Sequence, residues 1–175
     1  MSEQAKQQIP QLIRNSPILS TIISRYLAYS GQDHADEIIR AFDYALSAHG
    51  EQRRATGEPY IIHPLAVAEI LTELEVDDDT LIAALLHYTV EDTSKTVDEI
   101  RTDFGDEIAN LVDGVTKLSR IPYSSKEEIQ AENFRKMFLA MAKDIRVVLI
   151  KLADRLHNMR TMRHMSADKQ QEKAR

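Results

Sequence analysis

Residues 81–93, LIAALLHYTVEDT, decide the fold of this chain. An unbroken run of apolar residues precedes His87, so a helix over 80–88 would be apolar on almost every side. A helix of that kind is buried at the centre of a helical protein and does not lie on its surface. The acidic cluster 77–79 directly before it supplies an N-terminal cap. The stretch therefore predicts a central helix with a histidine at its C-terminal end.

Helical patterns occupy most of the remaining sequence as well. Only five glycines and five prolines interrupt the 175 residues, and alternating β-branched runs are absent. Apolar residues recur at helical spacing between capping and turn residues. The further predicted helices span 18–29, 34–48 with Asp33 as N-cap, 64–74, a short one from a Thr96/Glu99 capping box to Phe104, 106–118, 126–142, and a last one from about Asp144. We therefore expect an all-α helical bundle that forms a single domain over residues 1–175.

The composition narrows the class of protein. A hydrophobic fraction of 43% and a charged fraction of 29% are ordinary for a soluble globular protein. No apolar run approaches the ~20 residues of a membrane span, and the N-terminus MSEQAKQQIP is not a signal peptide, so we expect no membrane contact. The net charge of −6 argues against direct nucleic-acid binding. Without cysteine, a metal would be bound by histidine and carboxylate, and a cytoplasmic location is expected.

Three residues of metal-ligand type end or interrupt separate apolar runs. They are His63 in YIIHP, His87 in the central helix and Asp154 in IKLADRLHNMRTM. Each has an ordinary alternative: a histidine at a turn is often solvated, a buried histidine needs only a hydrogen bond, and Asp154 could pair with Arg54 or Arg155. Because a bundle can bring the three runs together, they also suit an open metallohydrolase site.

Other polar residues accompany these positions in the sequence. Glu91 and Asp92 follow the second histidine by four and five residues, and could handle a metal-bound water or form a solvated acidic pair. Asn158 shares a helical face with the aspartate four residues earlier and could bond to a sugar hydroxyl. The loop 53–57, RRATG, could wrap an anionic or planar ligand, and its second arginine could stack on a purine.

Four ordered blocks together resemble the hydrolase domain of the RelA/SpoT homologues, which make and degrade the alarmones guanosine tetra- and pentaphosphate. The blocks are HGEQRRATGEPYIIHPLAVAEIL, LLHYTVEDT, FGDEIANLVDGVTKLSRI and IKLADRLHNMRTM, and the match runs from about residue 35 to 165. The resemblance implies an all-α fold of the HD superfamily. It also implies a Mn²⁺-dependent removal of pyrophosphate from the ribose 3′ position.

The resemblance further implies roles for individual residues. His63, His87 and Asp154 match three protein ligands of the Mn²⁺ ion. Glu91 and Asp92 match the pair that activates and orients the attacking water. The positions that would contact guanine, ribose and phosphates are Arg54, Thr56, Asn158 and Thr161.

Tyr88 departs from the family pattern, because the resemblance implies an aspartate at this position as the fourth metal ligand. A phenol with a pKa of about 10 is a poor Mn²⁺ ligand, and the exchange removes a negative charge that balances the cation. We therefore expect metal binding that is weakened or lost, and hydrolysis reduced by orders of magnitude. The alternative function is a catalytically inactive guanine-nucleotide-binding or regulatory module of an alarmone synthetase. A third is an HD-superfamily phosphohydrolase that acts on another nucleotide.

The chain is also short for this family. Bifunctional members continue into a synthetase domain, whereas this sequence ends in the polar stretch EKAR soon after the last predicted helix. We expect it to be an N-terminal fragment of a longer synthetase/hydrolase, with a synthetase domain following in cis.

Overall fold

The computed structural model describes residues 16–31, 33–54, 57–119, 135 and 143–161. Over these residues the protein forms seven α-helices and no β-strand, which confirms the all-α prediction. A single isolated β-bridge pairs Arg53 with Pro59. The predicted helix 126–142 lies outside the described residues. Among the helices that are described, none combines the length and the apolar character needed to span a membrane.

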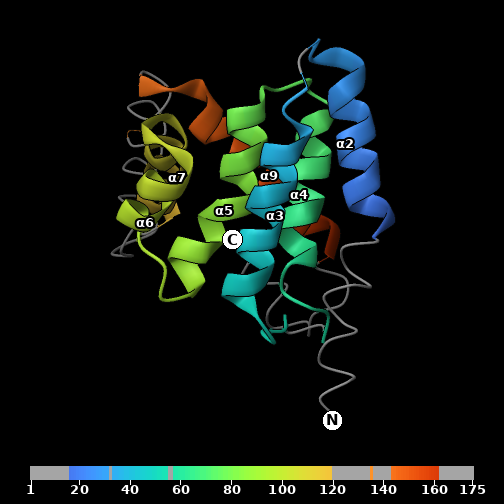
Figure 1. The fold of residues 1–175 in the computed structure, drawn as a ribbon. Coiled ribbons are helices and arrows are strands. Elements are labelled where there is room, and N and C mark those ends of the chain that lie inside the picture. The colour runs from blue at the N-terminus through green and yellow to red at the C-terminus, as the bar shows by residue number, and fades with distance from the viewer. Residues whose placement is uncertain (1–15, 32, 55–56, 120–134, 136–142, 162–175) are drawn as a thin grey trace.

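The helices pack around one central member (Figure 1). In chain order they are α2 (Pro17–Tyr29), α3 (Ala35–His49), α4 (Ile62–Thr72), α5 (Asp78–Asp92), α6 (Val97–Phe104), α7 (Asp106–Ser119) and α9 (Ile145–Thr161). Helix α5 lies in the middle, with α3 and α4 on one side and α7 on the other. Helix α9 crosses behind them and contacts α4, α5 and α7, so three sequence-distant helices meet along its inner face.

The central position of α5 follows from its sequence. Every residue from Thr80 to Thr89 is buried, which confirms the prediction made from the unbroken apolar run. Asp77 caps the helix by accepting a hydrogen bond from the backbone N of Thr80 at 2.8 Å. The predicted end at residue 88 was too early, because Val90 still packs against the core and carries the helix one turn further. Glu91 and Asp92 therefore occupy the last helical turn.

Other helix ends agree with the sequence in part. The capping box of Thr96 and Glu99 is present at the start of α6. The prediction of Asp33 as the N-cap of α3 was wrong: the cap position is His34, whose side chain makes no capping bond. The helix starts one residue later than predicted. Asp33 instead precedes the cap, and its Oδ1 accepts a hydrogen bond from the backbone N of Ala35 at 3.4 Å.

Helices α7 and α9 approach each other closely at Gly114. A Cβ atom built on this glycine would lie 2.8 Å from Cγ2 of Val147 on α9, closer than side chains tolerate. Val147 and Asp154 are both buried and stand two helical turns apart, so they share one face of α9. The glycine thus allows the close packing that holds the Asp154 side of α9 against the bundle.

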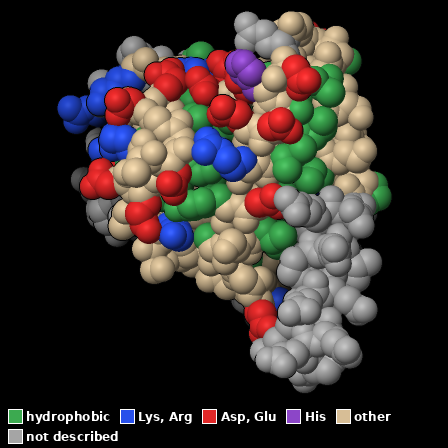
Figure 2. Space-filling view, in the orientation of Figure 1, with side chains coloured by type: hydrophobic (Ala, Val, Ile, Leu, Met, Phe, Trp, Pro, Cys, Tyr) green, Lys and Arg blue, Asp and Glu red, His purple; other side chains and the backbone are tan. Residues whose placement is uncertain are grey.

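Charged side chains of both signs are interspersed over the face that includes α6 and α7 (Figure 2). Several of them form ion pairs, such as Arg101 with Asp106 at 2.9 Å and Lys117 with Asp113 at 2.6 Å. Exposed pairs of this kind contribute little to stability, about 0–1 kcal/mol each. The charges on this face therefore keep the bundle solvated more than they hold it together.

Candidate active site

Asp154 is the centre of a buried hydrogen-bonded cluster where α4, α5 and α9 meet. Asp154 is only 2% exposed. Its Oδ1 accepts hydrogen bonds from the Tyr88 hydroxyl at 2.6 Å, from His63 Nε2 at 3.0 Å and from Asn158 Nδ2 at 2.8 Å. Its Oδ2 lies 3.0 Å from the ammonium of Lys151. Both carboxylate oxygens are therefore satisfied, as a buried charge requires.

The cluster keeps Asp154 ionised. Burial alone would raise the pKa of this carboxyl, but the hydrogen bond from His63, the charge of Lys151 and the Tyr88 hydroxyl outweigh it and hold the pKa well below its usual range. An ionised carboxylate can only accept hydrogen bonds, so the facing Nε2 of His63 carries a proton. Burial lowers the pKa of His63. The imidazole is therefore neutral, and its Nδ1 is an acceptor.

His157 fixes the other side of the His63 ring. The two Nδ1 atoms are 2.6 Å apart, so His157 donates to the acceptor nitrogen of His63. Burial and the proximity of His63 and Arg54 lower the pKa of His157 to about 4. At neutral pH His157 is an uncharged donor that sets the tautomer and the orientation of its neighbour.

Tyr88 points into this cluster. It is 9% exposed, and besides donating to Asp154 its hydroxyl lies 2.9 Å from Nε2 of His63. Its ring meets the rings of His63 edge-on at 4.8 Å and of Tyr60 at 5.7 Å, and tilts over His87 at 4.1 Å. Burial and the Asp154 carboxylate raise its pKa, so the hydroxyl stays protonated. Aromatic neighbours thus accommodate the bulk of the phenol.

His87 is fully buried in the middle of α5. Its Nδ1 donates to the backbone O of Ala84 at 2.9 Å, which leaves a lone pair on Nε2. This Nε2 has no hydrogen-bond partner within the part of the chain that the structure describes. Burial lowers the pKa of His87 to about 3, so the ring is neutral at pH 7. An unpaired, buried imidazole nitrogen is the donor that a metal ion uses.

The chemistry of this donor set fits a divalent cation. Two neutral imidazoles and a carboxylate, with no thiolate, suit metals that prefer oxygen and nitrogen ligands. As they stand, however, no three His, Asp or Glu side chains of the described residues are grouped so as to hold a metal ion. The Tyr88 hydroxyl bonds to both His63 and Asp154, and a proton occupies the His63 nitrogen. Metal binding would require that proton to leave and the hydroxyl to give way.

Arg54 reaches the cluster from the loop between α3 and α4. Its Nη2 donates to Asn158 Oδ1 at 2.9 Å, and Asn158 in turn donates to the central carboxylate. Its Nη1 is buried and has no partner among the described residues. Thr161 lies at the end of α9, where its hydroxyl donates to backbone carbonyls three and four residues earlier. Thr56, predicted in the same loop as Arg54, lies outside the described residues.

Glu91 and Asp92 lie in the last turn of α5, at the edge of the cluster. Glu91 is half-buried and Asp92 is exposed. The carboxylate of Asp92 accepts a hydrogen bond from the hydroxyl of Tyr60, and its backbone O accepts from Gln52 Nε2 at 3.0 Å. The pair is thus accessible to water while one member is held in place by the loop between α3 and α4.

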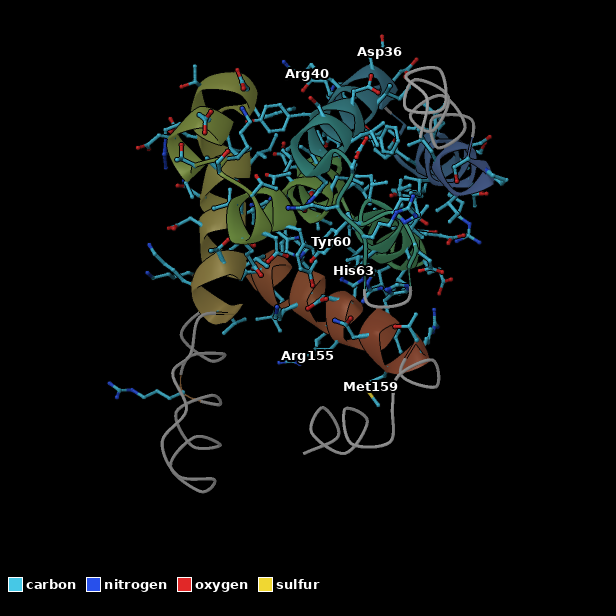
Figure 3. All side chains as sticks on the ribbon, turned by 90° about the horizontal axis from the view of Figure 1, so that it is seen from below. Asp36, Arg40, Tyr60, His63, Arg155 and Met159 are labelled. Carbon is cyan, nitrogen blue, oxygen red and sulfur yellow. The ribbon has the colours of Figure 1, made fainter. Side chains whose placement is uncertain are left out.

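Three residues of this site were not predicted from the sequence as members of it: Lys151, Tyr60 and, as an orienting group, His157. The alternative in which Asp154 pairs with Arg54 or Arg155 named the wrong partner, because the cation beside its carboxylate is Lys151, one turn earlier on the same helix. Figure 3 shows Arg155 directed away from the bundle, whereas His63 lies on the inner side of α9. The three-residue spacing of Lys151 and Asp154 was the available signal.

Comparison with known proteins places the chain in a family. The sequence profile of the family described as "HD domain" matches residues 41–175, more than half of the chain. The chain belongs to the HD domain family. The matched region contains the whole cluster around Asp154, and membership in the HD domain family suggests that the protein uses a divalent metal.

Curated relatives of this HD domain chain carry names from alarmone metabolism. A GTP pyrophosphokinase of Myxococcus xanthus is 54% identical over 145 residues, which are 81% of this chain and 19% of the relative. The guanosine-3′,5′-bis(diphosphate) 3′-pyrophosphohydrolase of Aquifex aeolicus is 54% identical over 144 residues, 82% of this chain and 20% of the relative. This chain thus spans about a fifth of the length of the curated relatives that it matches.

A solved structure supports the same assignment. It is described as "A metazoan ortholog of SpoT hydrolyzes ppGpp and plays a role in starvation responses". Its TM-score is 0.62 at 29% identity, and the match covers 78% of each chain. The resemblance to the hydrolase domain of RelA/SpoT homologues and the HD-type helical fold are both confirmed.

Proposed function

We propose that this chain is a guanosine 3′,5′-bis(diphosphate) 3′-pyrophosphohydrolase domain that acts on guanosine tetra- and pentaphosphate. The observation that carries the proposal is the meeting of sequence-distant blocks at one buried cluster, with His63, Tyr88 and Asp154 from three different helices. Relatives at more than half identity are named for this activity. The comparisons favour it over a catalytically inactive binding module.

In this proposal His63, His87 and Asp154 hold the metal ion. Their imidazole and carboxylate donors suit Mn²⁺, and the unpaired Nε2 of His87 is already available. When bound, a divalent cation lowers the pKa of water and stabilises charge on a phosphoryl group. The neighbouring His157 keeps the His63 ring oriented for this purpose.

The remaining residues bind the nucleotide and move the proton. Arg54 and Thr56 contact guanine, and Asn158 and Thr161 contact the ribose and its phosphates. The buried Nη1 of Arg54 has an unused donor for such a ligand. Glu91 and Asp92 together orient the attacking water and accept its proton. The water oxygen bonds to phosphorus, the bond from that phosphorus to the ribose 3′ oxygen breaks, and the 3′ oxygen takes up a proton. Guanosine tetraphosphate thus yields guanosine 5′-diphosphate and pyrophosphate, and the pentaphosphate yields the 5′-triphosphate and pyrophosphate.

Tyr88 reduces this activity in our proposal. Its hydroxyl already bonds to His63 and Asp154, and it lacks the negative charge that the resemblance implies at position 88. The test is pyrophosphate release from guanosine tetraphosphate with Mn²⁺, for this chain and for Tyr88→Asp. We expect the variant to be at least 100-fold faster, on the order of a lost transition-state interaction. A Tyr88→Asp protein that binds Mn²⁺ and the nucleotide but releases no pyrophosphate would overturn the proposal.

We further propose that residues 1–175 form a single HD-type domain within a longer, cytoplasmic synthetase/hydrolase. The relatives are about four times as long as this chain, since matches of 145 and 144 residues cover 19% and 20% of them, and one of the two is named GTP pyrophosphokinase. A synthetase domain in cis would account for that name.

A further inference from the structure

The loop between α3 and α4 is hydrogen-bonded to Asp92 at the end of α5. The Tyr60 hydroxyl donates to Oδ2 of Asp92, and Gln52 Nε2 donates to its backbone O at 3.0 Å. Gln52 is itself held, because His49 Nδ1 lies 2.9 Å from its Oε1. The rings of His49 and Tyr60 stack at 4.7 Å with an interplanar angle of 23°. We call His49, Gln52 and Tyr60 the Asp92 clamp.

We propose that Tyr60 is a positioning residue that fixes the Asp92 carboxylate for its part in the reaction. This inference rests on the proposed function, in which Asp92 accepts a proton. Asp92 is exposed, so without a partner its side chain would rotate among staggered conformers in water. The hydrogen bond from Tyr60 selects one orientation, and preorganisation of this kind contributes to rate more than to substrate affinity.

Tyr60 is itself rigidly held, which a positioning residue requires. Its ring is half-buried between the stacked His49 and the edge of Tyr88. Its backbone N donates to the O of Gln52 at 2.9 Å, which closes the loop. Burial and the Asp92 carboxylate raise the pKa of Tyr60, so the hydroxyl remains a donor across the physiological pH range.

The same loop connects the clamp to the nucleotide side of the site. Arg54 lies between Gln52 and Tyr60 in the loop, and its backbone N donates to the O of Glu58 at 2.9 Å. Its guanidinium bonds to Asn158 on α9. A nucleotide that binds to Arg54 therefore contacts the loop that carries Tyr60. Because Tyr60 orients Asp92, the orientation of that carboxylate depends on the conformation of this loop.

The test compares Tyr60→Phe with Tyr29→Phe, both in the Tyr88→Asp protein. Tyr29→Phe removes a hydroxyl that bonds to the backbone O of Val76 at 2.9 Å on the far side of α4, so it is a chemically matched control. We expect Tyr60→Phe to lower kcat about 10- to 100-fold, as for residues that orient a reacting group, with KM changed less than about 2-fold. Tyr29→Phe should leave both unchanged. With Asp92→Ala already present, Tyr60→Phe should have no further effect on kcat, because the carboxylate that Tyr60 orients is then absent.

A second measurement does not depend on activity. In the chain that retains Tyr88, whose ring packs against Tyr60, amide hydrogen exchange in the last turn of α5 should be about 5-fold faster or more in Tyr60→Phe than in Tyr29→Phe, because the clamp holds that turn. If Tyr88→Asp releases no pyrophosphate at all, the proposed function fails, and the exchange rates alone decide on the clamp. An unchanged kcat in an active Tyr60→Phe enzyme, a rise in KM alone, or equal exchange rates in the two variants would each overturn the inference.

Discussion

Removal of the Tyr88 hydroxyl probes the buried cluster directly, because Tyr88→Phe keeps the ring and its aromatic contacts. The substitution deletes the 2.6 Å hydrogen bond to Asp154, which is only 2% exposed. A hydrogen bond to a charged group contributes about 1.5–3 kcal/mol, and a buried carboxylate cannot recover the lost bond from bulk water. We expect the free energy of unfolding to fall by about 2 kcal/mol at pH 7. For a protein of this length that corresponds to a Tm lower by about 4–8 °C.

Urea denaturation followed by circular dichroism measures this loss. Tyr29→Phe is again the control, since its half-buried hydroxyl bonds to a neutral carbonyl and its removal should cost about 1 kcal/mol. A Tyr88→Phe protein that is no less stable than Tyr29→Phe would contradict a hydrogen bond from Tyr88 to a buried charge. It would mean that Tyr88 does not donate to an ionised Asp154 in solution.

Three further substitutions test other contacts. Lys151→Met leaves the buried Asp154 without its counter-charge and should lower the free energy of unfolding by about 3 kcal/mol. The control Lys117→Met removes an exposed ion pair and should lower it by less than about 1 kcal/mol. Equal losses in the two variants would contradict a buried pair. Gly114→Ala should lower the free energy of unfolding by about 1–3 kcal/mol although alanine has the better helix propensity, because the added Cβ would lie 2.8 Å from Cγ2 of Val147 on α9. A higher Tm would contradict this packing. Burial lowers the pKa of His49, so below about pH 6.5 the unfolded state takes up a proton that the folded state does not, and stability is lost on acidification. His49→Gln should therefore flatten the decline in stability that begins below about pH 6.5, by up to about 1.4 kcal/mol per pH unit. An unchanged slope would show that this ring is not held neutral.

The helical architecture could be predicted because it depends on patterns of many residues. The apolar run before His87 predicts that α5 is surrounded by other helices, and the buried residues from Thr80 to Thr89 confirm this prediction. The end of that helix was harder to predict. Residues after Tyr88 are mixed in polarity, and the packing of Val90 against other helices extends the helix beyond the local signal.

The meeting of His63, Asp154 and Asn158 could be expected from the ordered sequence blocks, but the hydrogen bonds among them could not. The choice of Lys151 over an arginine as counter-ion depends on which face of α9 is buried. The proton on His63 depends on the whole network, since it follows from the ionised carboxylate on one side and His157 on the other.

Tyr60 shows a different limit of prediction from sequence. A tyrosine in a polar loop belongs to no helical or strand period, so nothing in the local pattern marks it as functional. Its importance arises only when the loop folds back and its hydroxyl meets Asp92 at the end of another helix. Long-range contacts made by single loop residues are therefore where the structure adds most.

The most direct test of the central claim is the position of cleavage, followed by ³¹P NMR of guanosine tetraphosphate with the Tyr88→Asp protein and Mn²⁺. A 3′-pyrophosphohydrolase removes the 3′-diphosphate signals, retains the 5′-diphosphate and releases free pyrophosphate, and we expect this chain to do so at least about 100-fold more slowly than the variant. Cleavage of the 5′-diphosphate, or an intact nucleotide after prolonged incubation with a folded, Mn²⁺-loaded Tyr88→Asp protein, would contradict it.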